Sequence, residues 1–392
     1  MPESKTKTTP KKIHLIVGAR PNYMKAAPLY EELKKSPHFE ITLVHTGQHY
    51  DEEMSGIFFQ EFHLPKPQVY LGVGSGTHAE QTAKAMMRYE EVLIASRPDL
   101  VVVFGDVNST LACALSAVKL HIPVSHVEAG LRSFDRTMPE EINRLLTDHI
   151  SDYLFTTSTY DNSNLSREGI SREKIHLVGN IMLDTLSRYL DKAKKSAILA
   201  RLGLRVGGCI HPYALMTLHR VSNVDDRKVF SRILSGLDQA KQQLPILFPA
   251  HPRTVQRIKE FGLAEYFHVF DAAAEPLTLD EPEKIIIFPP QGYLDFTCLM
   301  AHAALVLTDS GGIQPETTFL GVPCLTLREN TEWTVTLEQG TNRLVGVDPD
   351  RIRGETQEIL KSDRPSPQVP EFWDGRTAVR IGEIITRDKA DA

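Results

Sequence analysis

Residues 308–312 read Thr308-Asp309-Ser310-Gly311-Gly312; they follow the apolar run 303–307, and Glu316 lies four positions beyond the second glycine. The apolar run predicts a buried strand, and the paired glycines predict a turn at which a helix begins. Backbone N–H groups in such a turn, together with the helix dipole, favour a bound anion. Glu316, one turn into the helix, could accept hydrogen bonds from a ribose diol. We therefore expect a nucleotide diphosphate here, although an ordinary strand-to-helix turn would use the same residues.

Short β-branched runs alternate with helical patterns on both sides of this stretch, which predicts βαβ units and parallel sheets. A polar helical stretch from about residue 183 to residue 205 separates two sets of runs, and Gly207-Gly208 after it should be a flexible break. The expected strands are 13–17, 41–45, 100–104, 123–127 and 153–156 in the first set, and 213–218, 246–249, 285–288, 305–308 and 324–327 in the second. We expect an α/β protein of two Rossmann-like, doubly wound parallel-sheet domains that face a central cleft.

The same pattern predicts the limits of the domains. Residues 1–12 are polar and rich in lysine, and we expect them to form a disordered leader. The amino-terminal domain should cover residues 13–182, and the carboxyl-terminal domain residues 183–369. A proline-rich approach then leads into a final helix at about residues 370–388.

The composition excludes several classes of protein. The 392 residues are 41% hydrophobic and 24% charged, which is ordinary for a soluble protein with two cores. Lysine and arginine total 44 against 50 acidic residues, and no basic block occurs, so nucleic acid is not an expected partner. The sequence contains no run of about 18 apolar residues, the length that a membrane-spanning helix needs, and we expect a cytoplasmic protein. The four cysteines lie far apart and the histidines lack ligand spacing, so we expect reduced thiols and no metal.

Two cations lie near the end of the first expected strand. That strand ends in Gly18-Ala19-Arg20-Pro21, and Lys25 follows in the next helix. Arg20 could bind a diphosphate through its planar fork, and Lys25 could add a point charge. Both could equally be solvated cations at a helix end. The loop is not a GxGxxG pattern, so a nicotinamide cofactor has little support.

Acidic residues follow other strands of the first domain. Asp106 follows the expected strand 100–104 and Gly105, Glu128 follows the expected strand 123–127, and Glu140-Glu141 begin a helix. Carboxylates at these positions face the crevice of an open parallel sheet, where active sites lie. The alternatives are an N-cap for Asp106, a surface turn for Glu128, and helical pairing of Glu140 or Glu141 with Arg144.

In the second domain, histidine-arginine groups follow two strands. His219-Arg220 ends the run 213–218, and His251-Pro252-Arg253 ends the run 246–249. His219 could donate to a phosphate oxygen or protonate it as it leaves. A histidine at a strand end is also a common structural residue.

Six motifs, in this order and spacing, resemble those of the non-hydrolysing UDP-N-acetylglucosamine (UDP-GlcNAc) 2-epimerases. They are Gly18-Ala19-Arg20-Pro21 with Lys25, Gly47-Gln48-His49, Gly105-Asp106-Val107-Asn108-Ser109-Thr110, His126-Val127-Glu128-Ala129-Gly130-Leu131-Arg132, Pro139-Glu140-Glu141-Ile142-Asn143-Arg144 and Asp309-Ser310-Gly311-Gly312. Each motif alone is weak, whereas together they are specific and span nearly the whole chain. The resemblance implies a GT-B fold in which the second domain holds UDP and the final helix returns to the first domain.

The resemblance also implies a reaction. The family interconverts UDP-GlcNAc and UDP-N-acetylmannosamine (UDP-ManNAc) by eliminating UDP to leave 2-acetamidoglucal, then adding UDP back after C2 is protonated on its opposite face. No cofactor is required, and a homodimer is implied. Inversion needs proton transfer at both faces, hence more than one acid or base. The implied catalytic residues are Asp106, Glu128, Glu140 and His219, and the implied substrate-binding residues are Arg20, Lys25, Arg144, Arg220, Ser310, Gly311, Gly312 and Glu316.

Some positions depart from the family pattern. Many regulated bacterial members have Gln-His-Arg and His-Arg-Arg-Glu where this chain reads Gln48-His49-Tyr50-Asp51 and His219-Arg220-Val221-Ser222, so arginines of an effector site are missing. Residues 108–110 and 132–134 are closer to members that act on UDP-2,3-diacetamido-glucuronate or related sugars. A 2-epimerase of such a sugar, a hydrolysing 2-epimerase, a GT-B glycosyltransferase and a non-catalytic UDP-sugar-binding protein are the alternatives.

Overall fold

The computed structural model of the chain describes residues 9–48, 62, 64–270, 284–362 and 368–387, and the side chain of Arg20 lies outside this description. Its contacts divide the chain into two compact units, residues 1–185 with 371–392 and residues 186–370. The division falls within helix α7 (Ile181–Lys194). Most of the expected disordered leader lies outside the described residues, but strand β1 already begins at Lys11.

The amino-terminal unit contains a parallel sheet of seven strands in the order β3-β2-β1-β4-β5-β6-β7. The strands are β1 (Lys11–Val17), β2 (Phe39–His45), β3 (Val69–Tyr70), β4 (Leu100–Phe104), β5 (Val124–Ala129), β6 (Tyr153–Thr156) and β7 (Ile175–Leu177). All five strands expected in this half are present. The edge strands β3 and β7 were not expected, because two or three residues carry no readable alternation.

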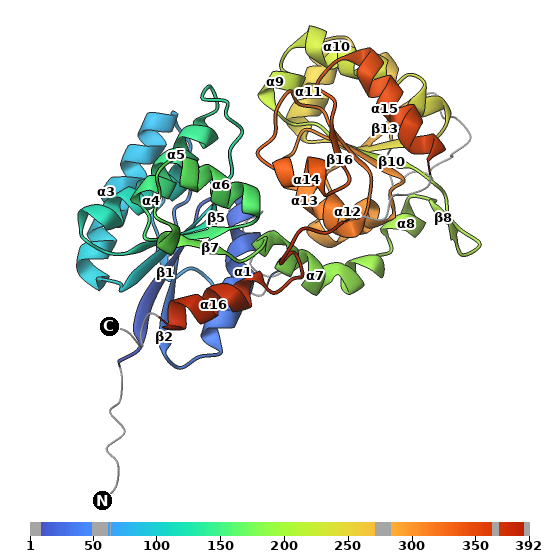
Figure 1. The fold of residues 1–392 in the computed structure, drawn as a ribbon. Helices are drawn as coiled ribbons and strands as arrows, with labels where there is room; N and C mark the ends of the chain where they lie inside the picture. Colours follow the sequence, from blue (N-terminus) through green and yellow to red (C-terminus); the bar gives the residue numbers. More distant parts are fainter. Residues whose placement is uncertain (1–8, 49–61, 63, 271–283, 363–367, 388–392) are drawn as a thin grey trace, which may run out of the picture. The chain divides into compact units, whose positions relative to one another are not determined.

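Helices cover both faces of this sheet (Figure 1). They are α1 (Arg20–Lys34), α3 (His78–Ser96), α4 (Asn108–Lys119), α5 (Pro139–Ile150), α6 (Thr159–Arg167), the first part of α7, and α16 (Thr377–Arg387). Helices α3, α4 and α5 pack side by side, and α3 and α4 form a core with one face of β1 and β4. Helix α1 packs against α16, which brings the end of the chain onto the amino-terminal unit.

Buried polar contacts hold this returning segment in place. The Asp184 carboxylate accepts the backbone N–H groups of Thr377 at 3.0 Å and Ala378 at 2.7 Å, which caps α16. The indole N–H of Trp373 donates to the carbonyl of Thr157 at 2.9 Å. A carboxylate and an indole that are buried with partners specify one docking position for the helix.

The carboxyl-terminal unit repeats this architecture with a parallel sheet in the order β12-β13-β11-β10-β14-β15-β16. Its strands are β10 (Ala214–Thr217), β11 (Ile246–Pro249), β12 (Phe267–Val269), β13 (Ile285–Phe288), β14 (Leu305–Thr308), β15 (Cys324–Thr326) and β16 (Asn342–Leu344). Its helices are α8 (Ile198–Arg201), α9 (Val221–Val224), α10 (Arg227–Gly236), α11 (Pro252–Glu260), α12 (Tyr293–His302), α13 (Ile313–Leu320), α14 (Thr334–Glu338) and α15 (Pro349–Lys361). The five strands expected here are present, and the short edge strands β12 and β16 are additional.

One expected break is ordered. Gly207 and Gly208 connect strands β8 (Arg205–Val206) and β9 (Cys209–Ile210) as a two-residue hairpin. Both glycines have positive φ, +59° and +86°, as a type I′ turn requires. These glycines therefore close a hairpin within the second unit, and the division between the units lies before it, in α7.

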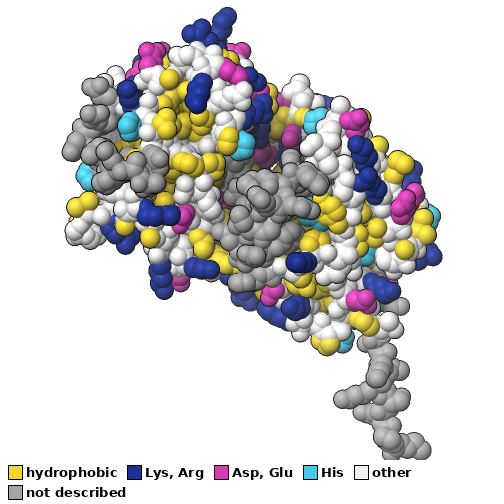
Figure 2. Space-filling model, turned by 180° about the vertical axis from the view of Figure 1, so that it is seen from behind, with side chains coloured by type: hydrophobic (Ala, Val, Ile, Leu, Met, Phe, Trp, Pro, Cys, Tyr) yellow, Lys and Arg dark blue, Asp and Glu magenta, His cyan; other side chains and the backbone are white. Residues whose placement is uncertain are grey.

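The strand orders place a topological switch point in each sheet. In the first sheet the chain leaves β1 in opposite directions toward β2 and β4, and in the second it leaves β10 toward β11 and β14. Ligands of open α/β sheets bind beyond the carboxyl ends of the strands at such points. Lysine and arginine lie scattered among acidic side chains on the face drawn in Figure 2. Among the described residues, none of the helices is sufficiently long and apolar for a membrane crossing.

Candidate active site

Lys25 and Glu128 form a buried ion pair beyond the carboxyl ends of β1, β4 and β5. The Lys25 ammonium donates to Glu128 Oε2, and the two side chains are only 8% and 4% exposed. Gly105, between them and β4, has a φ of +62°, and a Cβ there would lie 2.9 Å from Lys25 Nζ. The glycine is therefore required by both its backbone conformation and the approach of Lys25.

Glu128 has a backbone conformation that glutamate rarely adopts. Its φ is +72°, and the pairing of β5 with β6 shifts register between Val127 and Ala129. A non-glycine residue in this region costs on the order of 1 kcal/mol and persists where its surroundings determine it. The bulge re-aims the side chain at the strand end, as bulges next to active sites do.

Two opposing influences act on the pKa of Glu128. Burial raises the pKa of Glu128 above its ordinary value, although the Lys25 ammonium beside it opposes this shift. Its second oxygen, Oε1, is buried and has no hydrogen-bond partner among the described residues. A carboxyl group with a raised pKa and an open oxygen is suited to gaining and losing a proton.

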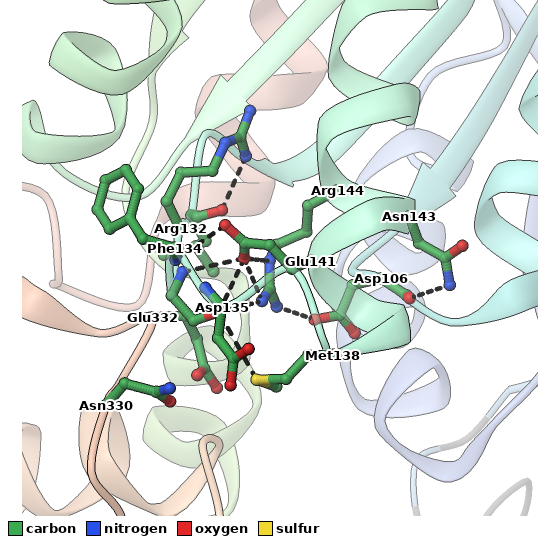
Figure 3. Close-up of polar contacts among 12 residues, drawn as sticks. Asp106, Arg132, Phe134, Asp135, Met138, Glu141, Asn143, Arg144, Asn330 and Glu332 are labelled. Carbon is green, nitrogen blue, oxygen red and sulfur yellow. Dashed lines mark hydrogen bonds and ion pairs between the residues drawn. The ribbon is translucent and has the colours of Figure 1, made fainter.

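Asp106 and Arg144 form a second ion pair, shown in Figure 3. Asp106, 31% exposed, accepts from Arg144 Nη1, while its backbone carbonyl accepts from Asn143 Nδ2 at 2.8 Å. Arg144 also donates to Glu141 Oε2 through Nη2 at 2.7 Å and Nε at 3.1 Å. Arg144 thus ties the Asp106 turn to α5.

Glu141 organises the loop before α5. Its carboxylate accepts the backbone N–H groups of Ser133 and Phe134, each at 3.0 Å, in addition to Arg144. Although burial acts to raise it, the pKa of Glu141 is lowered by the Ser133 N–H and the Arg144 guanidinium. Glu140, the neighbouring candidate, is half-buried in the first turn of α5 and has no recorded hydrogen bond among the described residues. Glu141 is therefore a structural residue, whereas the neighbouring Glu140 is accessible.

In the second unit, Asp309 connects the ends of β10 and β14. Its fully buried carboxylate accepts the backbone N–H groups of His219 at 3.0 Å and Arg220 at 2.9 Å, and contacts His219 Nδ1 at 3.0 Å. Burial acts to raise the pKa of Asp309, but the contact with His219 outweighs it and the pKa is lowered. The ionised carboxylate orients the His219 ring, which is 57% exposed.

The turn that follows Asp309 leads into α13. Gly312 is the N-cap with a φ of −64°, so left-handed geometry is not its role. Gly311 meets a close neighbour instead, because a Cβ there would lie 2.1 Å from Glu332 Oε1. Ser310 and both glycines are half-buried, and Glu316 is buried one turn later. The first N–H groups of a helix have no intrahelical partner, which leaves this turn suited to an anion.

The remaining expected residues fall as follows. Arg20 begins α1, but its side chain lies outside the described residues, as does His49. Arg220 is half-buried and is anchored through its backbone N–H. The described cysteines are all free, and the described residues contain no group of histidine, cysteine or carboxylate side chains able to hold a metal.

The sequence left open whether Glu140 or Glu141 pairs with Arg144, and in the structure Glu141 does so. The structural role of Asp309 was not expected. For Asp309 the partners lie about 90 residues away, so no local spacing identifies them.

Two Rossmann-like units, one carrying an acid–base cluster and the other an anion-type turn, define a GT-B-like protein of the class that handles nucleotide sugars. Residues 31–386 match the profile of the UDP-N-acetylglucosamine 2-epimerase family, and the chain belongs to that family.

Individual relatives agree with this assignment. The UDP-N-acetylglucosamine 2-epimerase of Methanocaldococcus jannaschii is 44% identical, over 96% of this chain and 100% of the relative. The crystal structure of an M. jannaschii UDP-GlcNAc 2-epimerase in complex with UDP-GlcNAc and UDP is similar with a TM-score of 0.84 at 43% identity, covering 96% of this chain and 99% of that one. The UDP-2,3-diacetamido-2,3-dideoxy-D-glucuronate 2-epimerase of Pseudomonas aeruginosa is 38% identical over 96% of this chain and 99% of its own length. The family and fold expected from the six motifs are confirmed.

Proposed function

We propose that this protein is a non-hydrolysing 2-epimerase that interconverts UDP-GlcNAc and UDP-ManNAc without a cofactor. The observation that carries the proposal is Glu128, a buried carboxyl group with a raised pKa and an open oxygen, held against Lys25 at the switch point of the first sheet. Similarity to 2-epimerases that are 42% and 44% identical over 96% of the chain supports the reaction type.

The reaction has two halves. A base removes the proton from C2 while the bond between C1 and the UDP oxygen breaks, and the electron pair leaves with UDP. The resulting 2-acetamidoglucal keeps a C1–C2 double bond. An acid then delivers a proton to the other face of C2, and the UDP oxygen attacks C1 again. No net oxidation occurs, so the chemistry requires no redox cofactor.

Three carboxyl groups of the first unit supply the acids and bases: Glu128, Asp106 and Glu140. Glu128 is suited to proton exchange because burial and Lys25 act on its pKa in opposite directions. Asp106 is held by Arg144 and is partly exposed, so it can contact a substrate. Glu140 has no recorded partner among the described residues and lies in the first turn of α5.

The second unit holds UDP in this proposal. The N–H groups of Gly311 and Gly312 donate to the diphosphate, with Ser310 beside them in the turn, and Glu316 accepts hydrogen bonds from the ribose hydroxyls. His219, oriented by Asp309, donates to the leaving phosphate, and Arg220 follows it in the same loop. Preorganised donors aimed at a leaving group are worth about 3 kcal/mol each. Arg20 and Lys25 add positive charge from the first unit.

Incubation with UDP-GlcNAc in heavy water, followed by NMR, tests the proposal. We expect UDP-ManNAc and UDP-GlcNAc that both carry deuterium at C2. Free N-acetylmannosamine with UDP would indicate a hydrolysing enzyme, and sugar transfer to an added acceptor would indicate a glycosyltransferase. Binding of UDP-GlcNAc without exchange at C2 would indicate a binding protein.

A second substrate class deserves the same assay. The relative named as a UDP-2,3-diacetamido-2,3-dideoxy-D-glucuronate 2-epimerase is 38% identical over nearly the full chain. Residues Asn108, Ser109 and Thr110 beside Asp106, with Arg132, Ser133 and Phe134, favoured this class in the sequence. A kcat/KM for the diacetamido sugar above that for UDP-GlcNAc would reassign the substrate.

The proposal includes a cytoplasmic homodimer whose product enters surface-polysaccharide synthesis. Light scattering should give twice the chain mass of 44.0 kDa. A mass equal to one chain would exclude the dimer and leave the reaction unaffected.

A further inference from the structure

His126, the first residue of the motif that ends in Arg132, is fully buried in β5. Its Nδ1 lies 2.6 Å from Asp148 Oδ1, and its Nε2 lies 2.7 Å from the carbonyl oxygen of Gly105. Both partners are acceptors with no proton to give. A neutral imidazole carries one N–H, so it could satisfy only one of them, whereas an imidazolium satisfies both.

The charges around Asp148 support the doubly protonated ring. Asp148 Oδ2 accepts from Arg132 Nη2 at 2.7 Å and from the backbone N–H of Gly130 at 3.1 Å. Arg132 is shared with Glu168, through contacts of 2.8 and 2.7 Å. The Arg132 guanidinium and the Gly130 N–H therefore both require Asp148 to act as an acceptor. With His126 charged, two cations alternate with two carboxylates in this buried network.

The network reaches the proposed acid–base group by two routes. The carbonyl oxygen of Gly105 contacts His126 Nε2, and Gly105 is adjacent to Asp106 and lies against Lys25 and Glu128. Glu128 is also two residues from His126 along β5. Among the described residues, the charged groups that face Glu128 are Lys25 from α1, Asp106 from the turn after β4, and His126 from β5.

We propose that the His126 ring donates from both nitrogens, to Asp148 and to the Gly105 carbonyl, and that it thereby acts as a positioning residue for the Gly105–Asp106 turn and as a positive charge beside Glu128. It contacts no substrate atom and exchanges no proton during the reaction. This inference rests on the proposed function for its kinetic consequence, but its protonation state stands on the geometry of the buried ring.

The protonation state can be measured without any assay of activity. In the full chain with ¹⁵N-labelled histidine, the His126 signals are identified as those lost in His126→Asn. We expect both ring nitrogens to carry a proton at pH 7.5, because each faces an acceptor. The assignment requires that the other histidine signals stay in place in the variant, and a His126 ring with one unprotonated nitrogen at pH 7.5 would overturn the proposal.

The kinetic consequence has a defined sign. Loss of a positive charge near Glu128 raises the pKa of that carboxyl group, so the limb of the pH–rate profile that Glu128 governs should move upward in His126→Asn, by about one pH unit. We also expect kcat to fall about tenfold or more with little change in KM, because the Gly105–Asp106 turn loses its anchor. His149→Asn is the matched control, since His149 is exposed on α5.

The outcomes separate this inference from the function on which it rests. If the wild-type protein exchanges C2 but a folded His126→Asn variant keeps the wild-type pH profile and kcat, the positioning role is wrong. If the wild-type protein exchanges no C2 proton at any pH, the proposed function fails, and the ring's protonation state is still decided by NMR.

Discussion

Paired side chains of opposite charge build the site of the amino-terminal unit, whereas backbone N–H groups gathered by one carboxylate build that of the carboxyl-terminal unit. In the first unit, Lys25 faces Glu128 and Arg144 faces both Asp106 and Glu141. In the second, Asp309 collects the N–H groups of His219 and Arg220 and leads into the Ser310–Gly312 turn. Side-chain charges can be gained or lost with a proton, while backbone dipoles are fixed.

This difference matches two separate chemical tasks. Inversion at C2 needs groups whose ionisation changes during the reaction. Burial and a charged partner can shift the pKa of a carboxyl group toward the working pH, where it can both gain and lose a proton. Holding a diphosphate through departure and return needs donors that keep their charge and position. The comparison therefore assigns proton transfer to the first unit and leaving-group binding to the second, and it can be tested at individual residues.

The largest effect should follow Glu128→Gln. The amide keeps the size of the side chain but cannot exchange a proton, so C2 exchange should fall roughly 100- to 10,000-fold. UDP affinity should stay nearly unchanged if, as proposed, the second unit holds the nucleotide. Deuterium incorporation by NMR and UDP titration calorimetry measure the two quantities.

Glu173→Gln provides the control for this prediction. Glu173 is exposed and lies far along the chain from the site motifs, so its exchange rate should equal that of the wild-type protein. If Glu128→Gln keeps wild-type exchange, proton transfer does not depend on Glu128 and the division of tasks fails at its centre.

The adjacent glutamates of α5 should separate stability from chemistry. Glu141→Gln removes one of the two counter-charges of buried Arg144, leaving Asp106, and weakens the acceptor of the 133–134 loop, so the free energy of unfolding should fall by about 2 kcal/mol. Glu140→Gln should change stability by less than about 0.5 kcal/mol and should lower C2 exchange. Urea denaturation and the exchange assay applied to both variants decide this. Equal loss of stability in both would show that Glu140 is also structural.

Buried carboxylates in the two units should give opposite pH dependences of stability. Asp161 accepts the N–H groups of Thr157 and Ser158 and forms no ion pair within the described part of the chain, and burial raises the pKa of Asp161 to about 6. Its contribution is therefore fully present below pH 3.8, its unfolded value, and is lost as pH rises through about 6. The pKa of Asp309 is lowered with the help of His219, so its contribution is present above pH 3.8 and is lost at lower pH.

Asparagine variants measure these contributions. Asp161→Asn should flatten the stability profile between about pH 4 and pH 6 and raise stability at pH 7 by on the order of 2 kcal/mol. Asp309→Asn should lower stability at pH 7 and flatten the profile below about pH 4. Urea titrations from pH 3 to pH 8 give both profiles. The same direction of change at pH 7 in both variants would contradict the role of the His219 contact.

The sequence predicted the central strands well and the edges poorly, for a physical reason. Strands buried on both faces, such as β4 and β14, are continuous apolar runs. Edge strands such as β3 and β16 have two or three residues and partial exposure, and they exist only because a neighbouring strand offers hydrogen bonds.

The sequence predicted where the candidate residues lie, and their roles stay predictions. Asp106, Glu128 and His219 lie near the carboxyl ends of β4, β5 and β10, as expected for parallel strands. The sequence could not decide which of Glu140 and Glu141 turns inward, since that depends on Ser133 and Phe134 meeting the carboxylate. The bulge that reorients Glu128 likewise depends on pairing with β6.

The smallest effect should follow Gly311→Ala, which tests whether close packing shapes the anion turn of the second unit. The new Cβ would lie 2.1 Å from Glu332 Oε1, and Glu332 is itself paired with Arg328 in a buried bridge of 2.8 Å. Because the Arg328 bridge holds Glu332, we expect the turn to move, which would misalign its N–H groups. We expect UDP affinity to fall about tenfold, roughly 1.4 kcal/mol, with titration calorimetry as the measurement.

Gly354→Ala is the matched control, because Gly354 lies in α15 and a Cβ there has no neighbour within 4 Å. That variant should gain about 0.5–1 kcal/mol of stability through lower backbone entropy of the unfolded chain, with no change in UDP affinity. If Gly311→Ala binds UDP as well as Gly354→Ala does, the 308–312 turn does not hold the nucleotide. The leaving group would then have to be bound by side chains, and the contrast between fixed dipoles and tunable charges would disappear.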